Sequence, residues 1–434
     1  GLADDGGLYV PVSLKKYSSK ELQGLKKLNY NELSAEIINL FSSDFISKNE
    51  LSSLIEKSYS TFREKEVVKL SNVGEIKLLE LFHGPTLAFK DVAMQFIGNL
   101  YEYYLSKNDK KINIVVATSG DTGAAAIDSI KGKSNLNIFV LHPNNRISSV
   151  QRKIMTTVEE KNVFNIAIDG NFDDCQNIVK SMFSDLEFAK SINMSGVNSI
   201  NWARIIAQSV YYFYSYFKLD KETVSFSVPT GNFGDVFAGY LAKKMGLPID
   251  KLIVATNEND ILHRAISKGD YVSREVKETS SPSMDIQLAS NFERLIYYIN
   301  NSECKKTADI MKKIKQNSYQ IENDNLEIIQ KDFTSESCNE NETLNIIKKN
   351  YEENHIILDP HTAVGVGAAN KLSFNDCVVL STAHPCKFPD ATNNAINMHK
   401  KLPEELQHVL DKKEHFHVLK NNTQDVKNFI KSKL

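Results

Sequence analysis

The feature that most constrains the fold of this 434-residue chain is a regular alternation of strand-like and helix-like patterns from about residue 76 to 260. Short apolar runs are each followed by a stretch with the three- and four-residue spacing of a helix that buries one face. This alternation is typical of a parallel sheet covered by helices. The expected strands lie near residues 112–117, 137–141, 164–168, 224–228 and 252–255.

The regions on either side of this alternation differ from it in composition. Polar, helix-forming stretches fill residues 14 to about 70, so we expect a small N-terminal helical unit over residues 1–75. The segment 302–354 is rich in Lys, Glu and Asn and poor in aromatic residues, which predicts an exposed helical insertion.

Composition excludes several classes of protein. The chain is 41% hydrophobic and 24% charged, as globular enzymes are. Its 52 Lys and Arg nearly balance its 54 Asp and Glu, so no nucleic-acid partner is indicated, and no apolar run is long enough for a membrane span. The five cysteines are scattered without CxxC spacing, which predicts reduced thiols in the cytoplasm and neither a metal site nor a disulfide framework. Because residue 1 is Gly, we expect any targeting segment to precede it.

One lysine stands inside an apolar, tightly turned segment, Leu81–Asp91, which reads LFHGPTLAFKD. A buried helical face begins at Phe89, so Lys90 is expected at a helix N-terminus. Dehydration and the helix dipole disfavour a charged amine at such a place. An uncharged amine is nucleophilic and can form a Schiff base with a carbonyl. The same pattern also fits a lysine that extends from a core helix to solvent.

Two strand–turn–helix junctions offer sites for anions. The strand at 224–228 leads into Pro229–Asp235 (PTGNFGD), and the strand at 112–117 leads into Thr118–Gly123 (TSGDTG). Backbone N–H groups at such a turn bind anions. The first turn matches neither a P-loop nor a dinucleotide fingerprint, so it favours a compact phosphate, although an ordinary strand–helix connection has the same pattern. The second turn suits a carboxylate, and Asp121 within it could instead be a helix N-cap.

The stretch 200–217 predicts a buried helix, because it is apolar almost all round. Its polar residues Asn201, Arg204 and Gln208 form a single stripe. Buried polar groups need partners, so this stripe should face a polar site or a subunit contact. A structural ion pair of Arg204 is the alternative.

Together these segments resemble the pyridoxal-phosphate enzymes of the tryptophan synthase β-subunit fold (fold type II), and most closely the threonine synthase family. The resemblance runs along nearly the whole chain, and the segment around Lys90 is its most diagnostic part. Further matching segments are Asp5–Pro11, Asn198–Arg204, Ser283–Gln287, Ser290–Arg294 and Thr382–Pro385.

The resemblance implies how the cofactor, pyridoxal 5'-phosphate, is held. Lys90 would form the Schiff base, and Thr382, at the end of a predicted strand, would contact the pyridine nitrogen. A hydroxyl partner leaves that nitrogen uncharged, which favours elimination over transamination. A strand-end cap is the alternative role of Thr382. The implied ligands of the cofactor phosphate are Gly231, Asn232, Phe233 and Asp235.

For the substrate, the resemblance implies a carboxylate site and a second phosphate site. Arg204 is the candidate clamp for the substrate phosphate, with Asn201 beside it. His83 would transfer protons or hold the leaving phosphate, or else orient its loop. The candidate carboxylate ligands are Thr118, Ser119, Asp121 and Thr122.

The implied fold class is α/β of fold type II, with two lobes, each a helix-covered and mostly parallel sheet, plus the N-terminal helical unit. The large cofactor-binding domain is expected over residues 76–106 and 200–434. A smaller lobe for the substrate carboxylate is expected over residues 107–199, and it should close over the substrate.

The implied activity is conversion of O-phospho-L-homoserine and water into L-threonine and phosphate, the last step of threonine biosynthesis, by a monomer or homodimer. Within the family, the alternative is a phospho-lyase that releases 2-oxobutyrate, ammonia and phosphate. The alternative from another class is a non-catalytic, ligand-binding relative. A serine/threonine dehydratase fits less well, because it would leave the second phosphate site unused.

Overall fold

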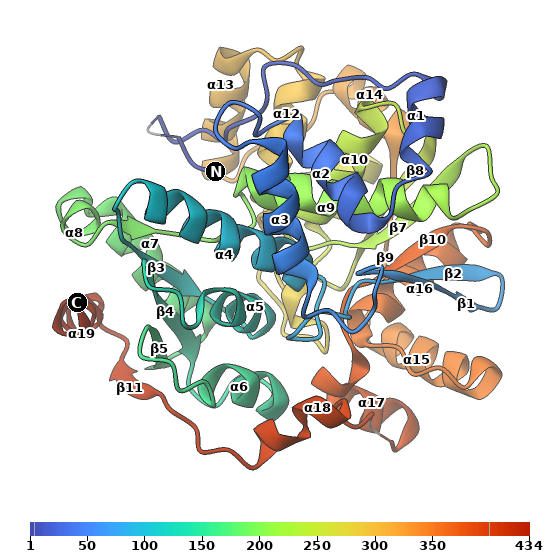
Figure 1. Ribbon diagram of the computed structural model, residues 1–434. Helices are drawn as coiled ribbons and strands as arrows, with labels where there is room; N and C mark the ends of the chain where they lie inside the picture. The colour runs from blue at the N-terminus through green and yellow to red at the C-terminus, as the bar shows by residue number, and fades with distance from the viewer. Residues whose placement is uncertain (4, 399) are drawn as a thin grey trace. The chain divides into compact units, whose positions relative to one another are not determined.

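The computed structural model describes residues 1–434 except residues 4 and 399, and it divides into two compact units (Figure 1). The first unit comprises Gly1–Glu56, Arg63–His83 and Ser199–Lys400. The second comprises Lys57–Phe62, Gly84–Asn198 and Lys401–Leu434. Among the described residues, each unit contains one sheet, of six strands in the first unit and five in the second.

The sheet of the first unit has six strands in the order β1-β2-β10-β7-β8-β9. All neighbours run parallel except β1 and β2, which form an antiparallel pair. Adjacent parallel strands deliver their carboxyl ends to the same edge of the sheet. The strands are β1 (Lys69–Val73), β2 (Ile76–Glu80), β7 (Val224–Pro229), β8 (Ile249–Thr256), β9 (Phe333–Ser337) and β10 (Val378–Ser381).

The register between β10 and β7 pairs Val379 with Ser227. Continuing that register brings the residues after the two strands, Thr382 and the turn that begins at Thr230, to neighbouring positions. Neighbouring strands lie about 4.8 Å apart, so two of the predicted cofactor contacts share one edge of this sheet.

Helix α16 (Pro360–Lys371) packs against this sheet with unusually close backbone contact. A Cβ at Gly365 would come within 2.9 Å of Val379 and 3.1 Å of Pro229, so only glycine fits there. The Ser227 hydroxyl donates to the Gly365 carbonyl at 2.7 Å. This contact seats the helix directly behind the strand ends that carry the predicted site.

The other helices of the first unit surround the sheet and the turns at its edge, and α3 extends into residues of the second unit. Capping boxes start α1, α2 and α15, in which a Ser or Asn and a Glu three residues later satisfy each other's backbone amides. These helices are α1 (Ser19–Leu25), α2 (Tyr30–Asn39), α3 (Lys48–Tyr59), α9 (Trp202–Phe217), α10 (Gly234–Lys244), α11 (Ile261–Lys268), α12 (Phe292–Ile299), α13 (Cys304–Lys315), α14 (Asn323–Asp332), α15 (Glu340–Asn354) and α17 (Pro389–Ile396), with 3-10 turns η1 (Pro282–Met284) and η2 (Pro385–Lys387).

The sheet of the second unit has five parallel strands in the order β11-β5-β4-β3-β6. Its strands are β3 (Ile112–Ala117), β4 (Leu136–Pro143), β5 (Val163–Asp169), β6 (Met194–Ser195) and β11 (His417–Lys420). Its helices are α4 (Lys90–Lys107), α5 (Asp121–Ile130), α6 (Ser149–Thr156), α7 (Phe172–Ser184), α8 (Leu186–Ser191), α18 (Glu404–Gln407) and α19 (Thr423–Lys433), with the 3-10 turn η3 (His408–Leu410). A Cβ at Gly98 would lie 2.3 Å from the Ser129 carbonyl oxygen, so α4 and α5 touch backbone to backbone.

The expected α/β class and the five expected strands are confirmed, as β3, β4, β5, β7 and β8. Four groupings differ from the predicted boundaries. Residues 84–106, expected in the large domain, cluster with the second unit. The described residues of 1–75, expected as a separate helical unit, cluster mostly with the first unit and supply β1 to its sheet. Residues 401–434 cluster with the second unit, where β11 is an edge strand, rather than with 200–434. The segment 302–354 is not only helical, because it contributes β9 to the sheet of the first unit. Both strands are short and largely polar, so their sequences carry little strand signal.

Over the described part of the chain, no helix is both long and apolar enough to cross a bilayer. The same residues contain no group of three or more His, Cys, Asp or Glu that could hold a metal ion.

Candidate active site

Lys90 is the first residue of α4 and is 7% exposed, so its side chain does not extend into solvent. The turn that precedes it is fixed by hydrogen bonds and close packing. The backbone amide and hydroxyl of Thr86 donate to the Asp91 carboxylate at 2.8 and 2.6 Å. A Cβ at Gly84 would lie 2.4 Å from the Cβ of Asp91, and Leu87 adopts a left-handed φ of 64°. Such strain is kept only where the surroundings over-determine the turn.

The surroundings of the Lys90 amine combine an aromatic ring and a carboxylate. Nζ lies 4.6 Å from the centre of the Phe89 ring and 3.6 Å from Oδ2 of Asp121. Both side chains of this ion pair are nearly inaccessible. The carboxylate stabilises an ammonium, which opposes the effect of dehydration. The expectation that dry surroundings alone keep this amine uncharged therefore left out Asp121.

The turn between β3 and α5 is organised by Thr118. Its buried hydroxyl oxygen accepts the backbone N–H groups of Gly120 at 2.9 Å and Gly123 at 2.8 Å. Gly120, with a φ of 136°, occupies the N-cap position, so the N-cap role considered for Asp121 is wrong. Asp121 instead accepts a hydrogen bond from Gln151 at 2.9 Å.

The remaining hydroxyls of this turn, those of Ser119 and Thr122, belong to partly exposed residues. The first backbone amides of a helix have no acceptor within the helix, and the helix dipole adds positive potential there. The turn can therefore offer these two hydroxyls and the Thr122 N–H at the start of α5 to an anion, whereas Thr118 binds the N–H of Gly123.

The turn between β7 and α10 is tighter. Phe233 takes a left-handed φ of 63° at the N-cap of α10 and buries its ring against Phe292 and Phe333. A Cβ at Gly231 would lie 2.5 Å from the Ser283 carbonyl oxygen, so this position admits only glycine. The first amides of α10 face the end of the turn, which is the arrangement that binds a phosphate group.

The carboxylate of Asp235, in the first turn of α10, is bound by two tyrosines of α9. The hydroxyls of Tyr211 and Tyr212 both donate to Oδ1, the second at 2.9 Å. Burial, followed by the Asp235 charge, raises the pKa of both tyrosines well above their ordinary value, so they remain donors. Because its side chain is engaged in this way, Asp235 can serve a phosphate only through its backbone amide.

Thr382, which follows β10, is 5% exposed and stands beside a buried hydrogen-bond chain. Ser381 bonds to Thr362 through their hydroxyls at 3.1 Å, and Thr362 donates to Asp359. Asp359 also accepts from the ring Nδ1 of His361 at 3.0 Å, and the backbone N–H of Ser283 donates to Nε2 of that ring at 3.3 Å. The chain thus joins the end of β10 to the residue that crowds Gly231.

Arg204 and Asn201 lie at the start of α9. Asn201 is the N-cap of this helix and accepts the backbone N–H of Ala203 at 3.0 Å. Arg204 is 4% exposed; burial lowers its pKa to about 10, and electrostatic attraction to Tyr211 and Asp235 opposes that change. Of the predicted polar stripe, Arg204 therefore lies near Asp235 and its tyrosines, and Asn201 caps its own helix.

His83, just after β2, is held on both sides. Its ring Nε2 lies 2.9 Å from Oε2 of Glu80, and the ring contacts Phe82. Its backbone carbonyl accepts the N–H of Arg63 at 2.8 Å. These contacts support the loop-orienting role that the sequence left open for this histidine.

The predicted site residues are divided between the two units. The first unit holds His83, Asn201, Arg204, Gly231, Asn232, Phe233, Asp235 and Thr382. The second unit holds Lys90, Thr118, Ser119, Asp121 and Thr122. Sequence reasoning missed the groups that fix these residues, namely Asp91, Gln151, Tyr211, Tyr212, Asp359 and His361. The tyrosines had a signal, because a hydroxyl on a fully buried helix requires a partner.

Comparisons with known proteins follow the whole length of the chain. Three family models match: "Threonine synthase N terminus" over residues 1–59, "Pyridoxal-phosphate dependent enzyme" over 66–382, and "Threonine synthase, C-terminal" over 362–430. The threonine synthase of Saccharomyces cerevisiae is 45% identical, with 100% of this chain and 94% of that protein covered. That of Pseudomonas aeruginosa is 43% identical, with 99% and 93% covered. Threonine synthase-like 2 of Mus musculus is 37% identical, with 91% and 85% covered.

Solved structures agree with these matches. The pyridoxal-phosphate-bound threonine synthase from Brucella melitensis superposes with a TM-score of 0.96 at 44% identity, covering 100% of this chain and 95% of that one. The yeast threonine synthase gives a TM-score of 0.94 at 44% identity, covering 100% and 94%. The fold-type-II class, the enzyme class and the pyridoxal 5'-phosphate cofactor expected from the sequence are confirmed. The chain belongs to the threonine synthase family of pyridoxal-phosphate-dependent enzymes.

Proposed function

We propose that this protein converts O-phospho-L-homoserine and water into L-threonine and phosphate. The observation that carries the proposal is Lys90, a buried amine fixed by the Thr86–Asp91 contacts at the first position of α4. In a chain of this family, such an amine is suited to hold a carbonyl cofactor covalently and then to move protons.

The residues present fit pyridoxal phosphate. Backbone amides of the turn Gly231–Asp235 would hold its phosphate, with the Phe233 N–H shaping the turn through its 2.8 Å bond to the Gly231 carbonyl. The Thr382 hydroxyl would meet the pyridine nitrogen. The Asp235 carboxylate, which would repel a phosphate, is bound by Tyr211 and Tyr212. When bound, the cofactor supplies an aldehyde that an amine can hold and a conjugated ring that withdraws electrons from a substrate.

The Lys90 amine would also transfer protons. After an amino-acid substrate displaces it, Nζ can remove the proton from the substrate Cα and later return protons along the chain. The Asp121 carboxylate, 3.6 Å from Nζ, would stabilise the ammonium that results. Gln151 holds that carboxylate in place through its other oxygen.

The substrate's own anions need two further sites. We assign its carboxylate to the hydroxyls of Ser119 and Thr122 and to the Thr122 N–H, with Thr118 holding the turn and Asp121 serving Lys90. Arg204 is the clamp for the substrate phosphate, since its buried guanidinium carries several N–H donors in a geometry that suits a phosphate. Asn201 fixes the start of α9, and His83 orients its loop.

The decisive experiment follows products by NMR with O-phosphohomoserine and records visible absorbance. Lys90→Ala should lose the absorbance of the lysine-linked cofactor and reduce turnover by about 10³-fold or more. Lys107→Ala, at the exposed end of the same helix, should retain both. Threonine production by Lys90→Ala would contradict the assignment.

The same assay separates the alternatives. Formation of 2-oxobutyrate and ammonia without threonine would identify a phospho-lyase. No turnover and no visible absorbance in the presence of added pyridoxal phosphate would identify a non-catalytic relative.

The five cysteines are free thiols, which supports the cytoplasm as the compartment of this protein.

A further inference from the structure

A fully buried arginine stands behind the turn proposed to bind the cofactor phosphate. Arg294 lies in the first turn of α12 and is 1% exposed. Its guanidinium donates to the backbone carbonyls of Tyr9 at 3.0 Å and Ile200 at 2.7 Å, and to Oδ1 of Asn291. All three acceptors are neutral, so the cost of burying this charge is only partly offset by them.

Asn291 carries the contact onward to the turn. Its backbone N–H and its side-chain Nδ2 both donate to the Asn232 carbonyl, each at 3.1 Å. The carbonyl of Asn232 and the N–H of Phe233 belong to one planar peptide group. Fixing the carbonyl therefore fixes the direction of that N–H, which donates to the Gly231 carbonyl at 2.8 Å, and with it the shape of the turn that leads into α10. Asn291 itself is fully buried.

The same pair of residues also holds the segment before α9. Nδ2 of Asn291 lies 3.2 Å from the Ser199 carbonyl, and Arg294 binds the next carbonyl, that of Ile200. The guanidinium carbon lies 5.4 Å from the ring centre of Trp202, the first residue of α9. One cation thus links the phosphate turn to the start of the helix that carries Arg204.

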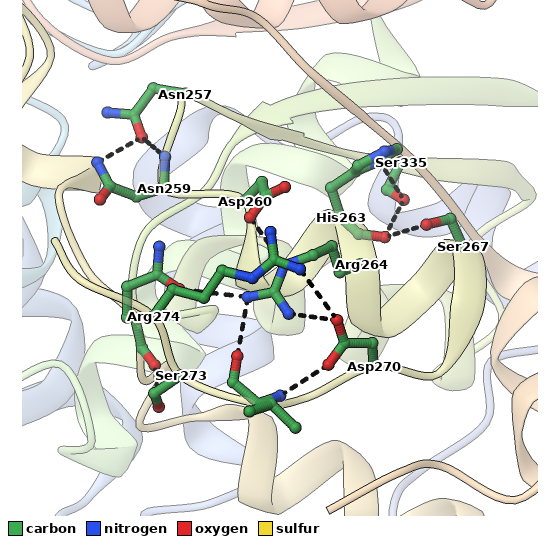
Figure 2. Close-up of polar contacts among 12 residues, drawn as sticks. Asn257, Asn259, Asp260, His263, Arg264, Ser267, Asp270, Ser273, Arg274 and Ser335 are labelled. Atoms are coloured by element: carbon green, nitrogen blue, oxygen red, sulfur yellow. Dashed lines mark hydrogen bonds and ion pairs between the residues drawn. The ribbon is translucent and has the colours of Figure 1, made fainter. Parts of the chain in front are cut away.

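A second buried arginine of the same unit, Arg264, has the contacts expected of a purely structural residue. Arg264, on α11, is 4% exposed and binds Asp260 at 2.8 Å and Asp270 at 2.6 Å (Figure 2). It also donates to the Val272 carbonyl at 2.9 Å. Two carboxylates bind the Arg264 guanidinium directly. The described hydrogen bonds of Arg294 go to neutral acceptors instead, and burial lowers its pKa to about 10 although the charge of the neighbouring Glu293 opposes that change. Glu293 therefore offsets the charge of Arg294 only in part, and the remainder can act on a nearby anion.

We propose that Arg294 is a positioning residue for the cofactor phosphate, which acts through Asn291 to align the Asn232–Phe233 peptide and through its charge to stabilise a phosphate dianion at this turn. The inference rests on the proposed cofactor site. It gives Arg294 two separable effects, one of geometry through Asn291 and one of charge.

The test uses the holoenzyme and measures the Kd of pyridoxal phosphate together with the ³¹P NMR titration of the bound cofactor. Arg294→Gln removes the charge and should raise Kd by about 10- to 100-fold, as loss of a charge-assisted contact does. Its bound phosphate should become dianionic at a pH higher by about 0.5, because the nearby cation is gone.

Two further variants separate geometry from charge. Arg294→Lys keeps the charge, so its ³¹P titration should stay near wild type while Kd rises less than in Arg294→Gln. Asn291→Ala keeps the charge but frees the Asn232 carbonyl, so Kd should rise while the titration stays near wild type. These two variants decide the question if Arg294→Gln does not fold.

The control is Arg264→Gln, which should lower stability toward urea without changing the ³¹P titration or changing Kd by more than about twofold. Wild-type Kd and titration in Arg294→Gln, or an identical response in Arg264→Gln, would overturn the proposal. Failure of the proposed reaction looks different: the holoenzyme would show the ³¹P signal but make no threonine, and the role of Arg294 would stand.

Discussion

The turn between β7 and α10 and the turn between β3 and α5 both join a buried parallel strand to a helix N-terminus. Each also carries an aspartate in the first helical turn. In the first unit, neutral tyrosine hydroxyls bind Asp235. In the second, Asp121 lies 3.6 Å from the Lys90 amine and accepts from Gln151. The same motif therefore places one carboxylate against tyrosine hydroxyls near the proposed phosphate site and the other beside the Lys90 amine.

Their glycines differ in the same way. Gly231 is required by its neighbours, since a Cβ would meet the backbone oxygen of Ser283 at 2.5 Å. Gly120 is required by its own backbone, with a φ of 136°, and the atoms nearest its missing Cβ belong to the flexible end of Gln151. One turn is rigid because other segments pack on it. The other is rigid because of local strain, and the space beside it is limited by a side chain, that of Gln151, rather than by backbone.

The largest expected effect, on cofactor affinity, comes from replacing each of these glycines with alanine. Gly231→Ala should weaken pyridoxal phosphate binding by roughly 100-fold, because overpacking against backbone costs about 1–3 kcal/mol or more. Gly120→Ala should leave cofactor binding near wild type and raise the KM for O-phosphohomoserine by about 10-fold, through strain at the carboxylate turn. Cofactor titration and steady-state kinetics measure both. An equal loss of cofactor in the two variants would break the comparison.

The paired aspartates should give a smaller effect. Asp235→Asn keeps an acceptor for Tyr211 and Tyr212 but turns charge-assisted bonds into neutral ones, so the free energy of unfolding should fall by about 1–2 kcal/mol with kcat little changed. Asp121→Asn should reduce kcat by about 10-fold, because the Lys90 ammonium loses its counter-charge.

Urea unfolding and single-turnover kinetics separate these outcomes. A kcat loss confined to Asp235→Asn, with Asp121→Asn affecting only stability, would reverse the roles assigned to the two carboxylates.

The sequence was informative where structure depends on local pattern. The strands before both turns are apolar runs, and the helix starting at Lys90 has a regular buried face, so periodicity alone located β3, β7 and α4. The four-residue β11 and the polar β9 were not foreseen, because their position depends on pairing with distant strands rather than on their own composition.

The partners within the site could not be foreseen for a related reason. Gln151 reaches Asp121 from thirty residues away, and Asn291 reaches Asn232 from fifty-nine. Asp121 was a reasonable N-cap by residue type, but Gly120 occupies that position and Thr118 accepts the N–H groups of Gly120 and Gly123. Hydrogen bonds of this kind depend on tertiary packing, which a single sequence does not specify.

The smallest expected effect is the loss of folding stability in acid, which should differ between the two units. His384, two residues after Thr382, is buried, and burial lowers its pKa to about 4, with the charges of Lys400 and Arg63 contributing. Between about pH 6.5 and 4 the unfolded chain binds a proton there that the folded chain does not, so stability falls as the pH falls through this window. From pH 7 to 5.5 the loss should be about 1 kcal/mol.

His384→Asn should remove this loss, because its Oδ1 can replace the Nδ1 that accepts the Cys386 N–H. The exposed His408 provides the matched control, and His408→Asn should unfold in urea with the pH dependence of the wild type. Acid should also lower the hydrogen-exchange protection factors of β10 more than those of β3, since burial lowers the pKa of His142, on the neighbouring β4, less than that of His384. Equal loss of protection in both strands would show that acid sensitivity does not distinguish the two junctions.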